Sequence, residues 1–257
     1  MALYGCGTWK ADSALALLRG TWTLSSISTG VPNGTQLVSG GVDTLVTLWD
    51  AASATPPRVL RGHRGSVHGV AWSPDGRQLA SGGRDFIGLW DPATGVRLHE
   101  LHDPSVAETS FLSVVWSPDG GLLACGSYLR GVQVWDMTTH TRCWVVETQS
   151  PHIRSVAWSP DGAQLVSGGD DGSMSVWDAR DGTQQQQLAG HHGAIMRVAW
   201  STDGRRLASA SGGQKGGELF VWEAHSGQRV QTFIGHPGLV HAIAWSPSGE
   251  ILLSGRQ

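Results

Sequence analysis

Charged residues are scarce in this chain. They make up 15% of its 257 residues, and the formal net charge at pH 7 is −3. Proteins that hold a phosphate backbone do so with a broad field of basic side chains, which this composition does not supply. We therefore expect a partner other than nucleic acid.

Cysteine is also rare and follows neither a metal-binding nor a disulfide pattern. Cys6, Cys125 and Cys143 are odd in number and show no CxxC spacing, which fits a reducing compartment. The chain does not open with a basic segment followed by an apolar one, and no uninterrupted apolar run approaches the length of a membrane span. The sequence predicts a soluble, cytoplasmic protein with no membrane partner.

The usual signatures of catalysis and cofactor binding are missing as well. The chain contains no Walker loop, GxSxG elbow, HExxH pair or calcium loop. The glycine-rich segment 212–217 lacks the GK[ST] ending of a phosphate loop and lies in a predicted hairpin. His68 and His241 occupy the same position in two repeats, and we interpret them as core histidines. We predict no enzymatic activity, no cofactor and no metal.

Tryptophan, by contrast, is frequent and periodic. Five tryptophans end short apolar runs at intervals of 44, 42, 42 and 45 residues: Trp72, Trp116, Trp158, Trp200 and Trp245. Five others precede an acidic residue: Trp49, Trp90, Trp135, Trp177 and Trp222. A period of about 40 to 45 residues carrying such pairs is typical of four-stranded blades in a repeat array.

The second repeat shows how a blade is built. A first run, Val67–Ser73, is joined by Pro74-Asp75-Gly76 to a second run, 78–82, which precedes the run that ends at Trp90. Proline, aspartate and glycine at successive positions favour a tight hairpin turn. The first strands of the repeats are apolar or small at nearly every position, which is typical of strands covered on both faces.

These residues closely resemble the WD-repeat β-propeller family, and the resemblance extends over essentially the whole chain. The second repeat matches the family pattern from Gly62-His63 to Trp90-Asp91. Members of the family carry a hydrogen-bonded set of histidine, serine or threonine, aspartate and tryptophan within a blade. The resemblance places this structural tetrad on His63, Ser81, Asp85 and Trp90.

The other repeats keep this set unevenly. The first and fourth repeats replace the histidine with Thr21 and Gln149, whereas the fifth keeps His191 but lacks the expected aspartate. The third keeps only Trp135, with Cys125 in place of the hydroxyl. We expect the third blade to be the weakest one or to pack through apolar contacts.

The first repeat also departs from the pattern in its first strand. Segment 22–31 lies where that strand belongs, because Gly20 and Gly34 are as far apart as Gly62 and Gly76. The segment lacks the Ala-Trp ending of its counterparts. We expect a strand there, in a blade that differs from the regular form.

The chain starts and stops inside a repeat, and its two ends look complementary. The C-terminus supplies two strands after Gly235-His236, and segments 3–9 and 14–18 could supply the other two. We predict an all-β fold, a six-bladed propeller of four-stranded antiparallel blades with one composite blade, in a single domain 1–257. The expected blade limits are 20–61, 62–102, 103–147, 148–189, 190–234, and 235–257 together with 1–19. The alternative is a fragment of a longer protein.

Partner choice in a repeat scaffold resides where equivalent positions differ. The entry to each inner strand and the residue before the hairpin aspartate are such positions, and in WD-repeat propellers this face commonly binds peptides. They hold Arg64, Arg84, Glu108, His152, Asp170 and His192. We predict a monomeric, non-catalytic scaffold for a protein or peptide partner. Alternatives are the sensor region of a signalling ATPase or kinase, and a propeller enzyme that uses the channel mouth.

Overall fold

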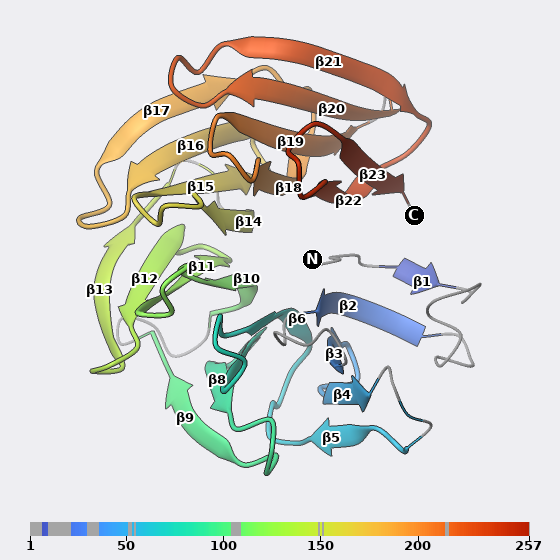
Figure 1. Ribbon diagram of the computed structural model, residues 1–257, viewed down its shortest axis with the longest axis vertical. Coiled ribbons are helices and arrows are strands. Elements are labelled where there is room, and N and C mark those ends of the chain that lie inside the picture. Colours follow the sequence, from blue (N-terminus) through green and yellow to red (C-terminus); the bar gives the residue numbers. More distant parts are fainter. Residues whose placement is uncertain are drawn as a thin grey trace. The chain divides into compact units, whose positions relative to one another are not determined.

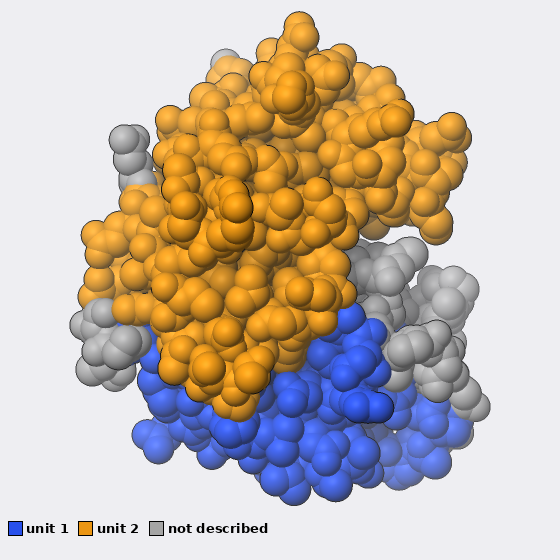
Figure 2. Space-filling model, turned by 60° about the vertical axis from the view of Figure 1, so that its left-hand side comes forward, with its two compact units in different colours: residues 1–111 blue, residues 112–257 orange. Residues whose placement is uncertain are grey.

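Antiparallel β-strands make up the regular structure of the chain. The computed structural model describes residues 7–9, 22–29, 36–50, 53, 55–103, 109–148, 150, 152–213 and 216–256. Within these residues there are 23 strands in six sheets and no helix (Figure 1). The predicted all-β class is confirmed. The chain divides into two compact units, residues 1–111 and 112–257, which Figure 2 colours separately.

The first unit contains two sheets whose strands are ordered as they follow one another in the chain. The first sheet consists of β1 (Gly7–Trp9), β2 (Trp22–Thr29), β3 (Gln36–Gly41), β4 (Val46–Asp50) and β5 (Arg58–Leu60). The second consists of β6 (Val67–Trp72), β7 (Leu79–Gly83), β8 (Ile87–Trp90) and β9 (Arg97–Leu101). Strand β2 confirms the first strand expected in segment 22–31.

The second unit contains three four-stranded sheets and one two-stranded sheet. Its first sheet is β10 (Phe111–Trp116), which begins at the unit boundary, β11 (Leu122–Ser127), β12 (Val132–Asp136) and β13 (Thr141–Val146). The next is β14 (Ile153–Trp158), β15 (Gln164–Gly169), β16 (Ser173–Asp178) and β17 (Gln184–Ala189). Then come β18 (Ala194–Trp200), β19 (Arg206–Gly213), β20 (Gly216–Glu223) and β21 (Arg229–His236), followed by β22 (Val240–Trp245) and β23 (Leu252–Arg256).

In four sheets the hairpin after the inner strand is closed by its own side chains. In the second sheet the Gly76 N–H donates to the Ser73 carbonyl at 2.9 Å, and Gly76 has a φ of 70° that favours glycine. The Ser73 hydroxyl donates to Asp75 at 2.7 Å and accepts the Gln78 N–H at 2.9 Å. The same bonds recur around Ser117, Ser159 and Ser201. The Ser-x-Asp-Gly motif therefore fixes where the inner strand ends in these four sheets.

Neighbouring sheets within a unit pack through a glycine of the second strand. A Cβ atom built on Gly40 would lie 2.5 Å from Cγ1 of Val67, the first residue of the next inner strand. Gly168 stands in the same relation to Ile195, at 2.5 Å from its Cγ2. Val67 and Ile195 are fully buried. The inner strands are thus covered on both faces, as their apolar sequences predict.

The two chain ends differ from the prediction in one respect. The sixth sheet has two strands, which is what the C-terminus contributes to a composite blade. However, β1 pairs with β2, with Trp9 opposite Trp22, instead of serving as the third strand of that blade. Pairing with β2 closes a short loop and so costs less chain entropy than closure across nearly the whole sequence. The fourth strand expected at 14–18 lies outside the described residues.

Candidate functional site

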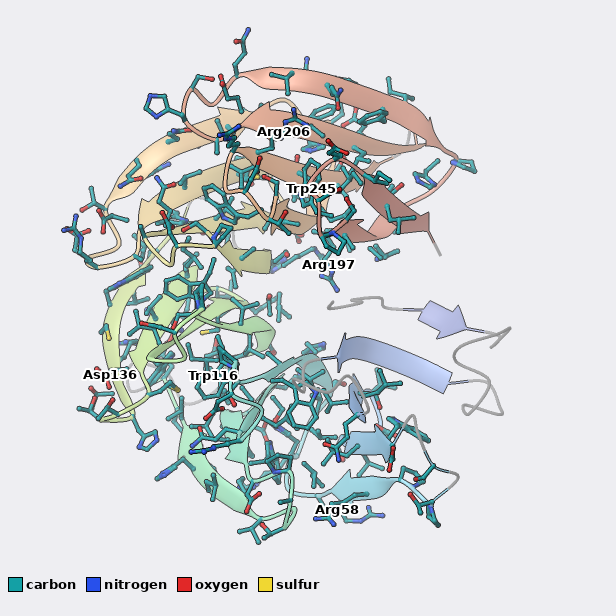
Figure 3. All side chains as sticks on the ribbon, in the orientation of Figure 1. Arg58, Trp116, Asp136, Arg197, Arg206 and Trp245 are labelled. Carbon is teal, nitrogen blue, oxygen red and sulfur yellow. The ribbon has the colours of Figure 1, made fainter. Side chains whose placement is uncertain are left out.

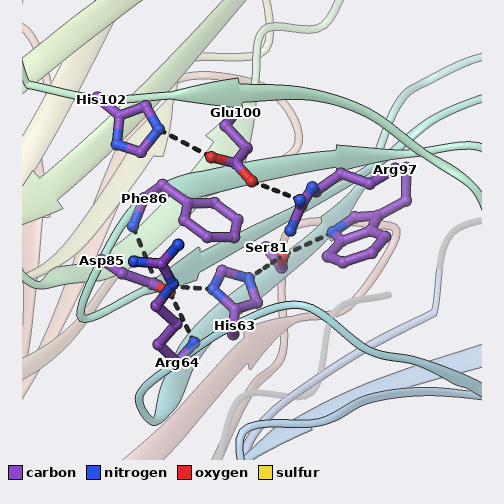
Figure 4. Close-up of polar contacts among 9 residues, drawn as sticks. His63, Arg64, Ser81, Asp85, Phe86, Arg97, Glu100 and His102 are labelled. Atoms are coloured by element: carbon purple, nitrogen blue, oxygen red, sulfur yellow. Dashed lines mark hydrogen bonds and ion pairs between the residues drawn. The ribbon is translucent and has the colours of Figure 1, made fainter.

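The second sheet contains a complete chain of buried hydrogen bonds (Figure 4). The Trp90 indole N–H donates to the Ser81 hydroxyl at 2.8 Å, and Ser81 Oγ lies 2.7 Å from Nε2 of His63. Nδ1 of His63 lies 2.8 Å from Oδ1 of Asp85. Burial lowers the pKa of His63, which keeps the imidazole neutral at pH 7. The network then has one consistent direction: indole to hydroxyl, hydroxyl to Nε2, and Nδ1–H to carboxylate.

Asp85 also connects this buried set to the surface. Its Oδ2 accepts the backbone N–H of Arg64 at 2.7 Å. Burial acts to raise the pKa of Asp85, but the hydrogen bonds from Arg64 and His63 outweigh it and hold the pKa below its ordinary value. The side chains of Arg64 and Arg84 are exposed, and Arg84 lies against Gly65. The structure therefore brings both predicted arginines to one end of the same sheet.

The fifth sheet carries an acid that the sequence analysis did not find. The Trp222 N–H donates to Ser209 at 2.8 Å, and Ser209 Oγ lies 2.6 Å from Nε2 of His191. Oε2 of Glu218 lies 3.3 Å from Nδ1 of His191. The expected aspartate is absent from this repeat, as the sequence shows, and Glu218 takes its place. The longer β19–β20 hairpin moves the acid from the turn onto β20, and the longer glutamate side chain reaches back to the histidine.

Glu218 has the same second role as Asp85. It accepts the backbone N–H of His192 at 3.0 Å, and its other oxygen lies 2.7 Å from Nδ1 of the exposed His192 ring. Burial acts to raise the pKa of Glu218, but the bonds from His192 and His191 lower it to about 2. Burial lowers the pKa of His191 to about 4. In both sheets a single carboxylate completes the buried set and fixes the surface residue that follows the histidine.

Other sheets keep parts of the set. In the first and fourth sheets the indole donates to the serine at 2.9 Å, in the pairs Trp49–Ser39 and Trp177–Ser167. In the sixth sheet His236 Nε2 lies 2.8 Å from Ser254 Oγ. Beside the Trp177–Ser167 pair is a cavity of about 300 Å³, lined in part by Ser150, Ser175 and Gln184.

The third sheet packs through apolar contacts at the equivalent place, as predicted. Trp135 is 4% exposed, and its indole nitrogen has no hydrogen-bond partner among the described residues. Cys125 occupies the serine position and is fully buried. Leu129 stands at the acid position, has a φ of 68° and is 65% exposed. An exposed leucine has no oxygen to accept hydrogen bonds. These residues therefore lack the carboxylate that joins the buried set to the surface backbone in the second and fifth sheets.

Two further predicted residues, His152 and Asp170, meet in the second unit. Nδ1 of His152 lies 2.6 Å from Oδ2 of Asp170. The Arg154 guanidinium donates two hydrogen bonds to the same carboxylate, one from Nε and one from Nη2, the latter at 3.0 Å. Tyr128 stacks on His152 with ring centroids 4.0 Å apart. Burial acts to raise the pKa of Asp170, but the bonds from Arg154 and His152 hold it lower. Glu108 lies outside the described residues.

Sequence reasoning missed Arg154 and Tyr128. Tyr128 precedes Leu129 just as Arg84 precedes Asp85, so its position in the repeat was a usable signal. It was hidden because Leu129 replaces the aspartate that marks the position.

Comparison with known proteins agrees with this geometry. The chain matches the family described as WD domain, G-beta repeat, in six segments: 16–50, 54–91, 96–136, 143–178, 182–223 and 227–257. It is a member of the WD40 family. Six WD40 repeats and six antiparallel sheets are consistent with a six-bladed propeller.

Named relatives of this WD40 chain match only parts of it. It is 32% identical to small ribosomal subunit protein RACK1y of Oryza sativa subsp. japonica over 41% of the chain and 30% of that protein. It is 30% identical to the transcriptional corepressor LEUNIG_HOMOLOG of Arabidopsis thaliana over 45% of the chain and 14% of that protein. It is 41% identical to WD repeat-containing protein slp1 of Schizosaccharomyces pombe over 26% of the chain and 14% of that protein. The matches therefore span less than a third of each relative's length.

The described residues of the WD40 chain contain neither a membrane-spanning helix nor a cluster of metal-binding side chains. No helix there has the length and apolar character needed to cross a membrane. No three histidine, cysteine, aspartate or glutamate side chains in that same part of the chain are grouped so that they could hold a metal ion.

Proposed function

We propose that this WD40 chain is a non-catalytic protein-interaction scaffold. It binds a peptide or protein at what we term the rim, the surface where the inner strands begin and the β-hairpins between second and third strands turn. In the first unit the rim comprises Arg64 and Arg84, and in the second unit it comprises Tyr128, His152, Asp170 and His192. Glu108 is included by its position in the repeat.

One observation carries this proposal. Asp85 and Glu218 each contact a buried histidine and also accept the backbone N–H of a rim residue, Arg64 or His192. A rim residue held in this way loses little conformational freedom when a partner binds, and preorganisation of this kind strengthens association. The set of tryptophan, serine, histidine and carboxylate is common to both sheets, whereas the surface side chain held beside it differs: arginine in one sheet and histidine in the other.

The named relatives support a role in assembly. One is named as a protein of the small ribosomal subunit and another as a transcriptional corepressor. We infer that the present chain likewise works through protein partners in the cytoplasm. The partner can be a separate protein or another region of a longer parent chain.

Affinity capture with a double charge reversal tests the proposal. The bait proteins are wild type and the Arg64→Glu, Arg84→Glu variant, and captured proteins are identified by mass spectrometry. Because both side chains are exposed and Asp85 binds the backbone of Arg64, the variant keeps the buried network. We expect it to lose partners that wild type captures.

The matched control is the Arg77→Glu, Arg205→Glu variant. It makes the same change in net charge at exposed positions in two Asp-Gly hairpin turns, away from the rim. It should capture the same partners as wild type. Equal capture by all three proteins would refute the assignment of the rim.

A further inference from the structure

Three inner strands of the second unit, β14, β18 and β22, share an irregularity near their start. The pairing register shifts between Ile153 and Ser155 in β14, between Ile195 and Arg197 in β18, and between Val240 and Ala242 in β22. A β-bulge removes one residue from the ladder and re-aims its side chain. The residues skipped are Arg154, Met196 and His241. The bulge therefore recurs at one place in the frame while the side chain it redirects varies.

Basic side chains gather at this place. Strands β14, β18 and β22 lie next to one another, and Arg197 follows the bulge of β18. Figure 3 shows Arg197 projecting from β18 away from the outer strands of its sheet. Burial lowers the pKa of His241, and the positive charges of Arg197 and Arg154 lower it further. The two guanidinium groups thus disfavour the protonated form of the imidazole.

His241 brings a second, independent observation. Its side chain is buried, with the residue only 8% exposed, and its Nε2 has no hydrogen-bond partner among the described residues. Leaving a buried polar atom unpaired costs about 1 to 3 kcal/mol. When the neutral imidazole carries its proton on Nε2, an incoming acceptor recovers that cost, and the positive charges of Arg197 and Arg154 favour an acceptor oxygen that is negative.

We propose that Arg197 and His241, supported by the charge of Arg154, bind a carboxylate of an acidic peptide segment. This assignment deepens the proposed scaffold function and rests on it. An arginine–carboxylate pair of this kind is already present in the protein, because the Asp170 carboxylate accepts hydrogen bonds from two nitrogens of Arg154. Planar guanidinium groups match carboxylates in this way.

The surroundings of the site favour a short segment over a long polyanion. With a net charge of −3, the chain offers no extended basic field for nucleic acid. Tyr128 is 44% exposed and stacks on His152, which shares Asp170 with Arg154. Its ring offers an aromatic surface for an apolar side chain next to the acid. The expected ligand is a glutamate or aspartate with an apolar neighbour.

Fluorescence anisotropy with short labelled peptides tests this site on the full chain. The first probe is rich in glutamate with one leucine, the second has glutamine in place of every glutamate, and the third has phosphoserine in place of every glutamate. We expect the glutamate peptide to bind at least about tenfold more tightly than the glutamine peptide, as loss of one charge-assisted contact implies. Stronger binding of the phosphoserine peptide than of the glutamate peptide would overturn the carboxylate assignment.

Three variants locate the binding. Arg197→Gln should weaken binding of the glutamate peptide at least about fivefold. Arg197→Lys keeps the positive charge but loses the planar pair of N–H donors, so its affinity for the peptide should lie between those of Arg197→Gln and wild type. Arg206→Gln is the control, because Arg206 is exposed at the hairpin end of the same sheet (Figure 3). Thermal unfolding of each variant shows that it is folded.

The outcomes separate this inference from the scaffold proposal. Equal effects of the Arg197 and Arg206 changes, or equal binding of the glutamate and glutamine peptides, would refute the carboxylate site. If affinity capture still depends on Arg64 and Arg84 in that case, the scaffold function stands without it.

Discussion

At the scale of single residues, one serine hydroxyl organises each complete set of buried polar groups. Ser81 and Ser209 each accept an indole N–H and pair with an imidazole, and both are fully buried. A hydroxyl suits this place because it donates one bond while accepting another. Its removal leaves two buried groups without partners, whereas removal of an ordinary surface serine leaves none.

The Ser81→Ala variant should therefore lose about 1 to 3 kcal/mol of unfolding free energy, because Trp90 and His63 each lose a partner. Urea denaturation measures the loss. Ser66→Ala, a half-buried position just before β6, should cost much less. Similar losses in the two variants would show that the hydroxyl network contributes little to stability.

The histidine of the fifth sheet predicts an acid-sensitive contribution to stability. Burial holds the pKa of His191 at about 4, below the ordinary 6.5, so acid protonates this imidazole in the unfolded chain first. Its contribution to stability is present above pH 6.5 and is lost as the pH falls toward 4. Glu218 has a pKa of about 2, below the ordinary 4.5, so its own contribution to stability is lost as the pH falls from 4.5 to about 2.

This prediction is tested by measuring the free energy of unfolding between pH 6.5 and about pH 4, the ordinary and the folded-state pKa of His191. The wild type should lose more stability on acidification than His191→Gln, in which the imidazole is absent. His225→Gln, at an exposed position in the same sheet, should follow the wild type. A profile of His191→Gln that is as steep as that of wild type would contradict the assignment.

At the scale of elements, close contact between neighbouring sheets depends on glycine in the second strand. Gly126 shows the same relation as Gly40 and Gly168, since a Cβ there would lie 2.7 Å from Cγ2 of Ile153. The neighbour in each case is a β-branched residue at the first or second position of an inner strand, and such a side chain has little freedom to move aside.

Gly168→Ala should destabilise the second unit by about 1 to 3 kcal/mol, because the new methyl group overlaps Ile195. Gly121→Ala is the matched change, since a Cβ there would meet Asp119 at an ordinary 3.6 Å. Thermal and urea unfolding compare the two. Equal stability of both variants would show that the sheets can separate to accept the methyl group.

The same elements show what sequence could and could not predict. The spacing of the tryptophans and the Ser-x-Asp-Gly turns defines the strands, because those signals act locally. The partner of β1 did not follow from the sequence, since an edge strand pairs through backbone groups that carry no sequence signal. Glu218 was missed because its role depends on side-chain reach across an extended hairpin. Arg154 was missed because a bulge, which repeats in the backbone, redirects it.

At the scale of the whole molecule, a repeated set of buried polar groups is combined with surface residues that vary between sheets. The buried histidines, serines and tryptophans serve stability, and the matched family repeats extend along most of the chain. The rim residues differ from one sheet to the next, which is where partner selectivity is expected in a repeat protein.

Site-specific photocrosslinking in cells is the most direct test of the claim that the rim binds the partner. A photoreactive residue is placed at Arg84 on the rim or, as control, at Arg180, whose side chain is 88% exposed in the β16–β17 turn. We predict covalent capture of a protein from position 84 and none from position 180. Capture from position 180 alone would contradict the account and move the binding surface away from the rim.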